Sequence, residues 1–267
     1  MRKYRKPHQF KRKKSIFRSR FFWLGILTLF IIGTTFYFLF FSEIFQVEKV
    51  IITGEKKVSA AEIKLLIEKK SENKILFFKT KSIFLVNLNG IRKDILNNFP
   101  QIAGIEIKRG LPDTLNIVVI ERLGLAIWCR EEQCFLLDNE GVIFEEALSE
   151  RDLIKVIDRQ NINYFSLGKK VIEKERMSQI LEITSKLESD LKIPLKEFMI
   201  VSENKLIVTT ADKWEIYLNL QSDIEWQLTK LRAVLEEKIF PEERKNLEYI
   251  ELRFGNFAPY KYRDQSI

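Results

Sequence analysis

The longest apolar run in the chain lies near its start. Residues 21–41 read FFWLGILTLFIIGTTFYFLFF and contain no charged side chain. An α-helix rises 1.5 Å per residue, so this run reaches about 31 Å, which matches the roughly 30 Å hydrocarbon layer of a bilayer. The pattern therefore predicts a single transmembrane helix over 21–41. A cleaved signal peptide is the alternative, but its apolar region would be shorter and would end in small residues, not in Phe40 and Phe41.

Positive charge is concentrated before this helix. Residues 1–20 hold ten Lys and Arg and no acid, whereas only Lys49 lies within the ten residues that follow the helix. The positive-inside rule then predicts a cytoplasmic N-terminus, with the rest of the chain outside the cytoplasmic membrane. We expect the tail to contact anionic lipid. A nucleic-acid arm is the alternative, but its stacking would rest on Tyr4 and Phe10 alone.

Residues 43–121 have the pattern of a compact α/β domain. A β-rich segment at 45–52 precedes a helix that starts at Ser59, where Glu62 completes a capping box. A second helix is predicted over about 82–98. Two strands with alternating apolar residues follow, and their inward positions are Ile105, Ile107, Leu115, Ile117 and Val119. The predicted order is β-α-α-β-β.

Residues 122–256 mix short strands with two longer helices, so the chain as a whole is of the α+β class. A hairpin is predicted from 125–129 and 134–137. Apolar stripes predict helices near 173–190 and 224–239. The remaining alternating segments predict strands at 197–201, 205–210, 214–219 and 247–254.

The two cysteines, Cys129 and Cys134, lie opposite each other in the predicted hairpin. Outside the cytoplasm such a pair is expected to form a disulfide. It would close a short loop and contribute only about 2 kcal/mol to stability. Two free buried thiols are the alternative.

Charge and residue counts exclude several classes of function. Ten of the 45 basic residues lie in the tail, so the rest of the chain balances its 37 acidic residues and is almost neutral. Such a body is not typical of a nucleic-acid-binding domain. The only histidine is His8, in the tail, which excludes catalytic arrangements based on imidazole and the usual zinc sites from the folded part. We therefore expect no enzyme, no cofactor, no metal and no small-molecule substrate.

Several short phrases, in their order and spacing, resemble one known family. Those that resemble a POTRA domain are VEKVIITG at 47–54, VS at 58–59, FPQI at 99–102 and KRGLPDTLNI at 108–117. Those similar to the second domain of the FtsQ/DivIB cell-division family are ER at 121–122, AIW at 126–128, LDNEGVIF at 137–144 and IELR at 250–253. A POTRA domain directly after one membrane helix also looks like this family. The stretch 71–77 departs from it, because it lacks a glycine that the family often carries.

The resemblance implies a bitopic scaffold of the bacterial divisome, located at the septum. Such a scaffold binds other membrane division proteins and helps to control septal wall synthesis. It implies domains at 43–121 (POTRA) and 122–256 (FtsQ/DivIB-type), followed by a tail at 257–267. It also implies that the last strand receives FtsB, the partner of FtsL, by β-augmentation. The candidate partner-binding residues are Tyr249, Ile250, Glu251, Leu252, Arg253 and Phe254.

Three other interpretations remain open. In the first interpretation, the charged residues of the last strand form only a solvated strand face. The second is a POTRA-bearing secretion or outer-membrane assembly factor, which would require repeated POTRA domains or a series of barrel strands. The third is a membrane-anchored cell-wall enzyme, whose acids would have to be Asp138, Glu145 and Glu146.

Overall fold

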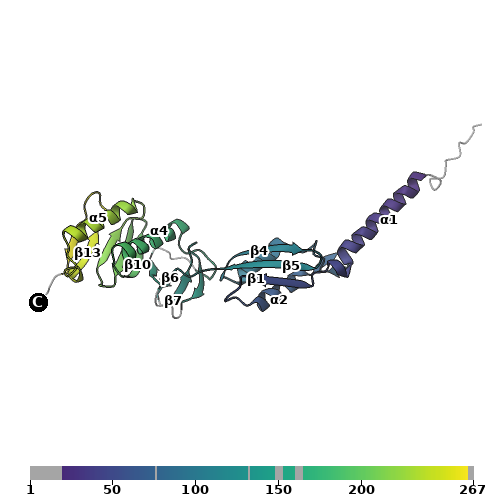
Figure 1. Cartoon of the computed structure of the whole chain (residues 1–267), viewed down its shortest axis with the longest axis horizontal. Coiled ribbons are helices and arrows are strands. Elements are labelled where there is room, and N and C mark those ends of the chain that lie inside the picture. The colour runs from purple at the N-terminus through teal and green to yellow at the C-terminus, as the bar shows by residue number, and fades with distance from the viewer. Residues whose placement is uncertain (1–19, 76, 132, 148–152, 160–164, 264–267) are drawn as a thin grey trace, which may run out of the picture. The chain divides into compact units, whose positions relative to one another are not determined.

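The computed structural model describes residues 20–75, 77–131, 133–147, 153–159 and 165–263 (Figure 1). Contacts between residues divide it into two compact units. The first holds the described residues up to Thr53, Ala60–Ile91 and Ile107–Ile117. The second holds Gly54–Ser59, Arg92–Glu106 and the described residues from Val118 onward.

Among the described residues, one helix is long and apolar enough to cross a membrane. This helix, α1 (Arg20–Phe41), has a mean hydropathy of 2.1 in its most apolar window, and none of that window is buried. Thr28 and Thr34 donate their hydroxyl groups to the carbonyl oxygens of Leu24 and Phe30, both at 2.8 Å, so the helix satisfies its own polar groups. The predicted helix is confirmed. The tail before Arg20 lies outside the described residues, so its contact with lipid stays a prediction.

A three-stranded sheet with two helices follows, in the predicted order. The elements are β1 (Lys49–Thr53), α2 (Ala60–Ser71), α3 (Leu88–Asn98), β4 (Ile102–Gly110) and β5 (Thr114–Glu121). The sheet order is β1-β5-β4. The five inward positions predicted on β4 and β5 are all buried. Helix α2 begins directly after Ser59, where the sequence predicts its start.

The start of the second helix was predicted wrongly. Helix α3 begins at Leu88, not near 82. The guanidinium group of Arg109 donates to the carbonyl oxygens of Ile83 at 2.7 Å and Val86 at 2.8 Å. The side chain of Asn87 accepts from the N–H of Gly90 at 2.9 Å, which favours a helix start at this point. The contact with Arg109 is made between residues far apart in sequence, so local periodicity could not reveal it.

A small hairpin that the sequence did not predict lies between α2 and α3. It consists of β2 (Asn73–Ile75) and β3 (Phe78–Thr80), paired as a two-stranded antiparallel sheet. It overlaps the stretch 71–77, which lacks the glycine that the family often carries.

The second unit contains a nine-stranded mixed sheet with the order β14-β13-β12-β11-β10-β9-β6-β7-β8. Its strands are β6 (Ala126–Arg130), β7 (Gln133–Leu137), β8 (Ile143–Glu146), β9 (Lys155–Asp158), β10 (Leu195–Ser202), β11 (Lys205–Thr210), β12 (Glu215–Leu218), β13 (Leu247–Glu251) and β14 (Tyr260–Tyr262). The predicted hairpin and meander are confirmed.

Two helices lie on this sheet (Figure 1), and their apolar side chains belong to its buried core. They are α4 (Lys174–Ser185), which continues as a π-helical turn to Asp190, and α5 (Ile224–Glu237). Met177 of α4 and Leu231 of α5 belong to the same buried cluster as Phe198, Ile216 and Ile250 of the sheet. Both predicted helices are therefore confirmed.

Candidate functional site

The C-terminal end of the nine-stranded sheet differs from the prediction. Strand β13 ends at Glu251 instead of 254, and β14 forms within the residues predicted as a tail. β13 pairs in parallel with β12 on one side and antiparallel with β14 on the other. It is therefore an interior strand. The edge of the sheet is β14, whose outer side has no strand neighbour among the described residues.

The six predicted partner-binding residues occupy different environments. Ile250 and Leu252 are fully buried, and Glu251 is 6% exposed, so their side chains belong to the interior. Tyr249 and Arg253 are half-buried, and only Phe254 is well exposed. The six residues thus do not form one accessible surface. The sequence missed Tyr260–Tyr262, although its Tyr-Lys-Tyr pattern directly after Pro259 has the alternation of an edge strand.

Glu251 and Arg253 form an ion pair rather than a solvated strand face. Arg253 donates from Nε and from a terminal nitrogen to the two carboxylate oxygens of Glu251, at 2.8 and 2.6 Å. Its backbone N–H donates to the same carboxylate at 3.1 Å. The hydrogen bonds from Arg253 compensate the cost of burying the Glu251 carboxylate. The IELR phrase therefore has a structural role at the end of this strand.

Backbone groups of β14 point away from the sheet at alternate residues. The carbonyl oxygen of Pro259 accepts from Glu251, and the N–H of Arg263 donates to Asn246, both at 2.8 Å. Residues 259 and 263 therefore face β13. Since neighbouring residues of a strand point their backbone groups to opposite sides, the N–H and C=O groups of Tyr260 and Tyr262 face outward. These are the groups to which another strand can bind.

A buried lysine holds the loop between β13 and β14. Lys230 of α5 is 7% exposed, and the three N–H groups of its ammonium are shared among four backbone carbonyl oxygens within hydrogen-bond distance. The acceptors are Leu252 at 2.7 Å, Gly255 at 2.9 Å, Phe254 at 3.2 Å and Phe257 at 3.3 Å. Burial lowers the pKa of Lys230, and the nearby charge of Glu251 acts in the opposite direction. The sequence offered no sign of this role, because Lys230 lies in an ordinary amphipathic helix.

Side chains of β14 and its surroundings add further contacts. Lys261 pairs with Glu248 at 2.7 Å, and the hydroxyl group of Tyr262 donates to Glu243 at 3.3 Å. The guanidinium group of Arg263 donates to the carbonyl oxygen of Lys213 at 2.6 Å. These contacts hold the middle and the C-terminal end of the short edge strand.

Aromatic residues lie on the sheet next to this edge. The rings of Tyr217 and Tyr249 stack with centroids 5.1 Å apart, and the ammonium group of Lys205 lies 4.4 Å from the ring centroid of Tyr217. Burial, together with a hydrogen bond to Glu215, raises the pKa of Tyr217 above its usual value. Tyr217 therefore stays neutral at physiological pH.

Cys129 and Cys134 face each other across the β6–β7 hairpin. They are register partners, their Cα atoms are 4.2 Å apart, and the structure joins their sulfur atoms as a disulfide of 2.02 Å. The state of the pair in the cell stays a prediction that thiol labelling can test.

The two folded parts of the chain match two family models. Residues 45–122 match "POTRA domain, FtsQ-type", and residues 126–253 match "Cell division protein FtsQ/DivIB, C-terminal". The chain belongs to the FtsQ/DivIB family. It is therefore a cell-division protein with a POTRA domain, and helix α1 fits a single-pass membrane protein of the division septum.

Curated relatives in the FtsQ/DivIB family agree. The chain is 37% identical to the cell division protein FtsQ of Rickettsia bellii over 97 residues, which covers 36% of this chain and 33% of the relative. It is 23% identical to the cell division protein DivIB of Clostridium tetani over 164 residues, 59% of this chain and 60% of the relative. It is 22% identical to the cell division protein FtsQ of Neisseria meningitidis over 188 residues, which covers 70% of this chain and 72% of the relative. The chain thus spans a third to 60% of the length of the first two relatives.

The structure explains the FtsQ/DivIB-like phrases near residues 121 and 138. The carboxylate of Glu121 accepts from the backbone N–H groups of Lys56, Lys57 and Val58, at 2.7, 2.9 and 2.9 Å. Burial acts to raise the pKa of Glu121, but these donors outweigh it, and the pKa lies below its usual value. Arg122 forms an ion pair with Asp138, so the two acids have structural partners.

The glycine of the LDNEGVIF phrase at 137–144 is also required by geometry. Gly141 has φ +75°, and a Cβ atom at this position would overlap the carbonyl group of Ile172. Asp138 accepts from the N–H groups of Glu140 and Val142, at 3.0 and 2.9 Å. Asp138 and Gly141 therefore shape this FtsQ/DivIB turn. Its neighbour Glu145 pairs with Lys57 at 3.6 Å.

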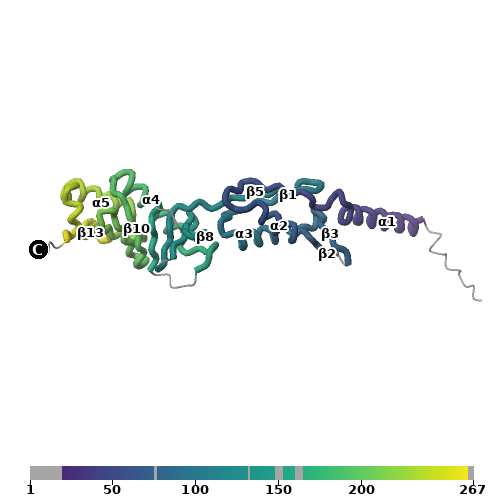
Figure 2. The backbone as a smooth tube through the Cα atoms, turned by 90° about the horizontal axis from the view of Figure 1, so that it is seen from below, coloured from purple at the N-terminus to yellow at the C-terminus, as the bar shows by residue number. Residues whose placement is uncertain are grey.

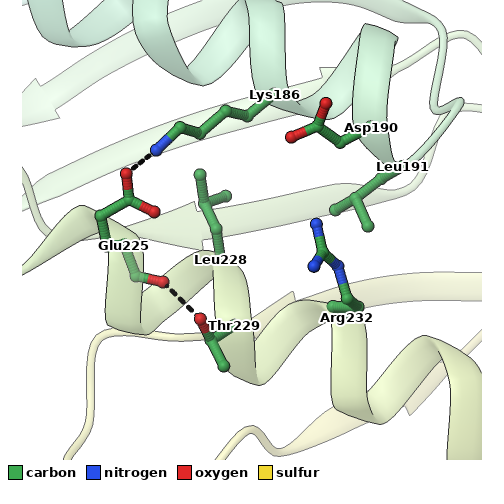
Figure 3. A pocket seen from close by; sticks show the side chains of 7 residues that line it. All are labelled: Lys186, Asp190, Leu191, Glu225, Leu228, Thr229 and Arg232. Carbon is green, nitrogen blue, oxygen red and sulfur yellow. Dashed lines mark hydrogen bonds and ion pairs between the residues drawn. The ribbon is translucent and has the colours of Figure 1, made fainter.

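A small polar pocket lies between α4 and α5 (Figure 3). Its volume is about 90 Å³, and Lys186 on one side forms an ion pair with Glu225 on the other. Pockets that bind small molecules are usually larger, about 300–1,000 Å³. In the part of the chain that the structure describes, no group of three His, Cys, Asp or Glu side chains is placed to hold a metal ion.

Proposed function

We propose that this chain is a non-catalytic scaffold of the divisome that captures a partner strand at β14. Helix α1 holds the folded domains at the membrane, with the N-terminus in the cytoplasm and the domains outside it. The partner is a pair of membrane division proteins of the FtsB/FtsL type, and its capture helps to control septal wall synthesis. The POTRA domain, 43–121, recruits a second partner.

The observation that supports this proposal most is the outer side of β14, which no other described strand covers. Tyr260 and Tyr262 direct unpaired backbone groups outward, and Lys230, Lys261 and Arg263 hold the strand in place. An edge strand held in this way can accept a strand from another chain with little loss of conformational entropy. The docking domain, predicted at 122–256, must then extend to Tyr262, because β14 belongs to its sheet.

The rival classes of function have less support. Of the three acids nominated for a cell-wall enzyme, Asp138 and Glu145 are engaged in ion pairs, and Glu146 is exposed on the surface. A secretion or outer-membrane assembly factor would need further POTRA domains or barrel strands, whereas residues 126–253 match the C-terminal model of the cell-division family.

A pair of substitutions at Tyr262 tests the docking edge. Tyr262→Pro removes an outward N–H that the fold does not use, whereas Tyr262→Thr removes the same side chain and keeps the N–H. Both variants of the full chain, with the partner pair co-expressed, are extracted from membranes and captured by a tag. We expect the proline variant to bind about tenfold less partner, since one lost hydrogen bond is worth about 1.4 kcal/mol. The threonine variant should bind like the wild type.

Two outcomes would contradict the proposal. Equal capture by the proline and wild-type chains, with circular dichroism unchanged, would exclude the β14 edge as the docking site. Turnover of purified cell wall by the full chain above background would contradict the non-catalytic assignment.

A further inference from the structure

The β2–β3 hairpin is fastened to the C-terminal end of α1 (Figure 2). The hydroxyl group of Thr80 donates to the carbonyl oxygen of Phe40 at 2.5 Å, and that of Ser82 donates to Leu39 at 3.0 Å. These carbonyl groups belong to the last turn of α1, which has no helical donors for them. The hairpin therefore completes the end of the helix and is held beside it.

Aromatic rings make the same connection. Phe78 of β3 lies edge-on against Phe41, the last residue of α1, with ring centroids 5.9 Å apart. If α1 crosses a bilayer, its last residue marks the depth of one membrane interface. Phe78 then lies at that same depth, whichever side of the membrane this is.

The tip of the hairpin exposes large apolar side chains. Phe77 is 89% exposed, and Phe78 is 65% exposed despite its contact with α1. These two adjacent aromatic residues at a strand turn therefore leave most of their surface uncovered by the protein. Amphipathic and aromatic groups are favoured where the bilayer meets water.

Basic residues surround this aromatic tip. Lys74, Lys79 and Lys81 lie on or next to the hairpin, against the single acid Glu72. Glu72 pairs with Lys79 at 3.5 Å and Lys81 at 3.8 Å, and the Lys79 side chain remains 80% exposed. The hairpin thus combines exposed aromatic rings with an excess of positive charge, which is the chemistry that binds an anionic lipid surface.

We propose that the β2–β3 hairpin is a second membrane contact, which inserts Phe77 and Phe78 into the interfacial layer of the bilayer. Lys74 and Lys79 bind lipid phosphate groups beside it. The occupant is the anionic phospholipid leaflet at which α1 ends, because the hairpin adjoins the membrane helix and carries the complementary charge. Together, α1 and the hairpin fix the tilt of the first unit on the membrane, which a single helix cannot do.

A fluorescent label in the full chain tests this contact. The environment-sensitive dye NBD is attached at Phe77→Cys or, as the matched control, at Leu65→Cys on α2, where the native side chain is 66% exposed. The native cysteines are kept oxidised, and wild-type chain treated with dye measures any background. The chain is reconstituted in nanodiscs of phosphatidylcholine, with or without phosphatidylglycerol. Quenching by doxyl groups on lipid chains reports contact with lipid, and quenching by iodide reports contact with water.

The expected result is a blue-shifted emission at position 77, with lipid quenching several-fold stronger than at position 65. Phosphatidylglycerol should increase that quenching, and Lys74→Gln with Lys79→Gln should abolish the increase. Equal lipid quenching at the two positions would overturn the proposal. Protection from iodide without lipid quenching would also overturn it, since a protein such as a second copy would then cover the hairpin. Quenching that is independent of phosphatidylglycerol would overturn the preference of Lys74 and Lys79 for an anionic leaflet.

Discussion

Replacement of Lys230 by methionine should release the strand that forms the edge of the sheet. Methionine has nearly the volume of the lysine stem but donates no hydrogen bond, so four carbonyl oxygens lose their donor. Three of them belong to Phe254, Gly255 and Phe257, which are exposed and can bind water instead. The carbonyl oxygen of Leu252 belongs to a fully buried residue and stays unpaired.

The size of the effect follows from that one buried acceptor. A buried polar group left without a partner costs about 1–3 kcal/mol. Taking about 2 kcal/mol, and tenfold per 1.4 kcal/mol, the loop and β14 should open roughly 30-fold more often. The cost should be local, because the apolar stem of the side chain keeps its packing in α5.

Hydrogen exchange measured by mass spectrometry on the full chain in micelles checks this expectation. The amides of Glu251 and Arg263, which bond across the β13–β14 pair, should exchange about 30-fold faster in Lys230→Met. Amides of β10 and β11 should not change. Arg232→Met, an exposed cation on the same helix, is the matched control and should exchange like the wild type.

Unchanged exchange at Glu251 and Arg263 in the Lys230→Met chain would refute the reasoning. An equal acceleration over the whole sheet would refute it as well, since Lys230 would then contribute to general stability and not to the position of β14.

Two further outcomes are expected. Because the folded pKa of Glu121 lies below its unfolded value, its contribution to stability is present at neutral pH and is lost as the pH falls through the folded pKa. Calorimetry from about pH 6 to pH 3 should therefore show a larger fall in the melting temperature for the wild type than for Glu121→Gln. A parallel fall in both would contradict this. The unreduced, unfolded chain should show no free thiol, and Cys129→Ser with Cys134→Ser should lower the free energy of unfolding by about 2 kcal/mol. Labelling of the unreduced wild type would show that the pair is not oxidised.

The local elements of this protein follow from the sequence. The apolar run determines α1, since an uncharged helix of this length is stable only in lipid or in a core. The stripes of α4 and α5 and the alternation in β4 and β5 follow from the periods of helix and strand. The facing positions of Cys129 and Cys134 follow from a short hairpin, and the turn at Gly141 follows from a motif whose residues are neighbours in sequence.

Only the tertiary structure decided where the sheet ends and what lies beside the membrane helix. β14 is a three-residue strand that pairs with β13, and the loop between the two strands is bound by Lys230, more than 20 residues earlier in the chain. Helix α3 starts late because Arg109, in a distant strand, binds the carbonyl groups that precede it. The β2–β3 hairpin next to Phe41 likewise depends on side-chain hydrogen bonds from Thr80 and Ser82. In each case the deciding contact joins residues that are distant in sequence, and periodicity carries information only about neighbours.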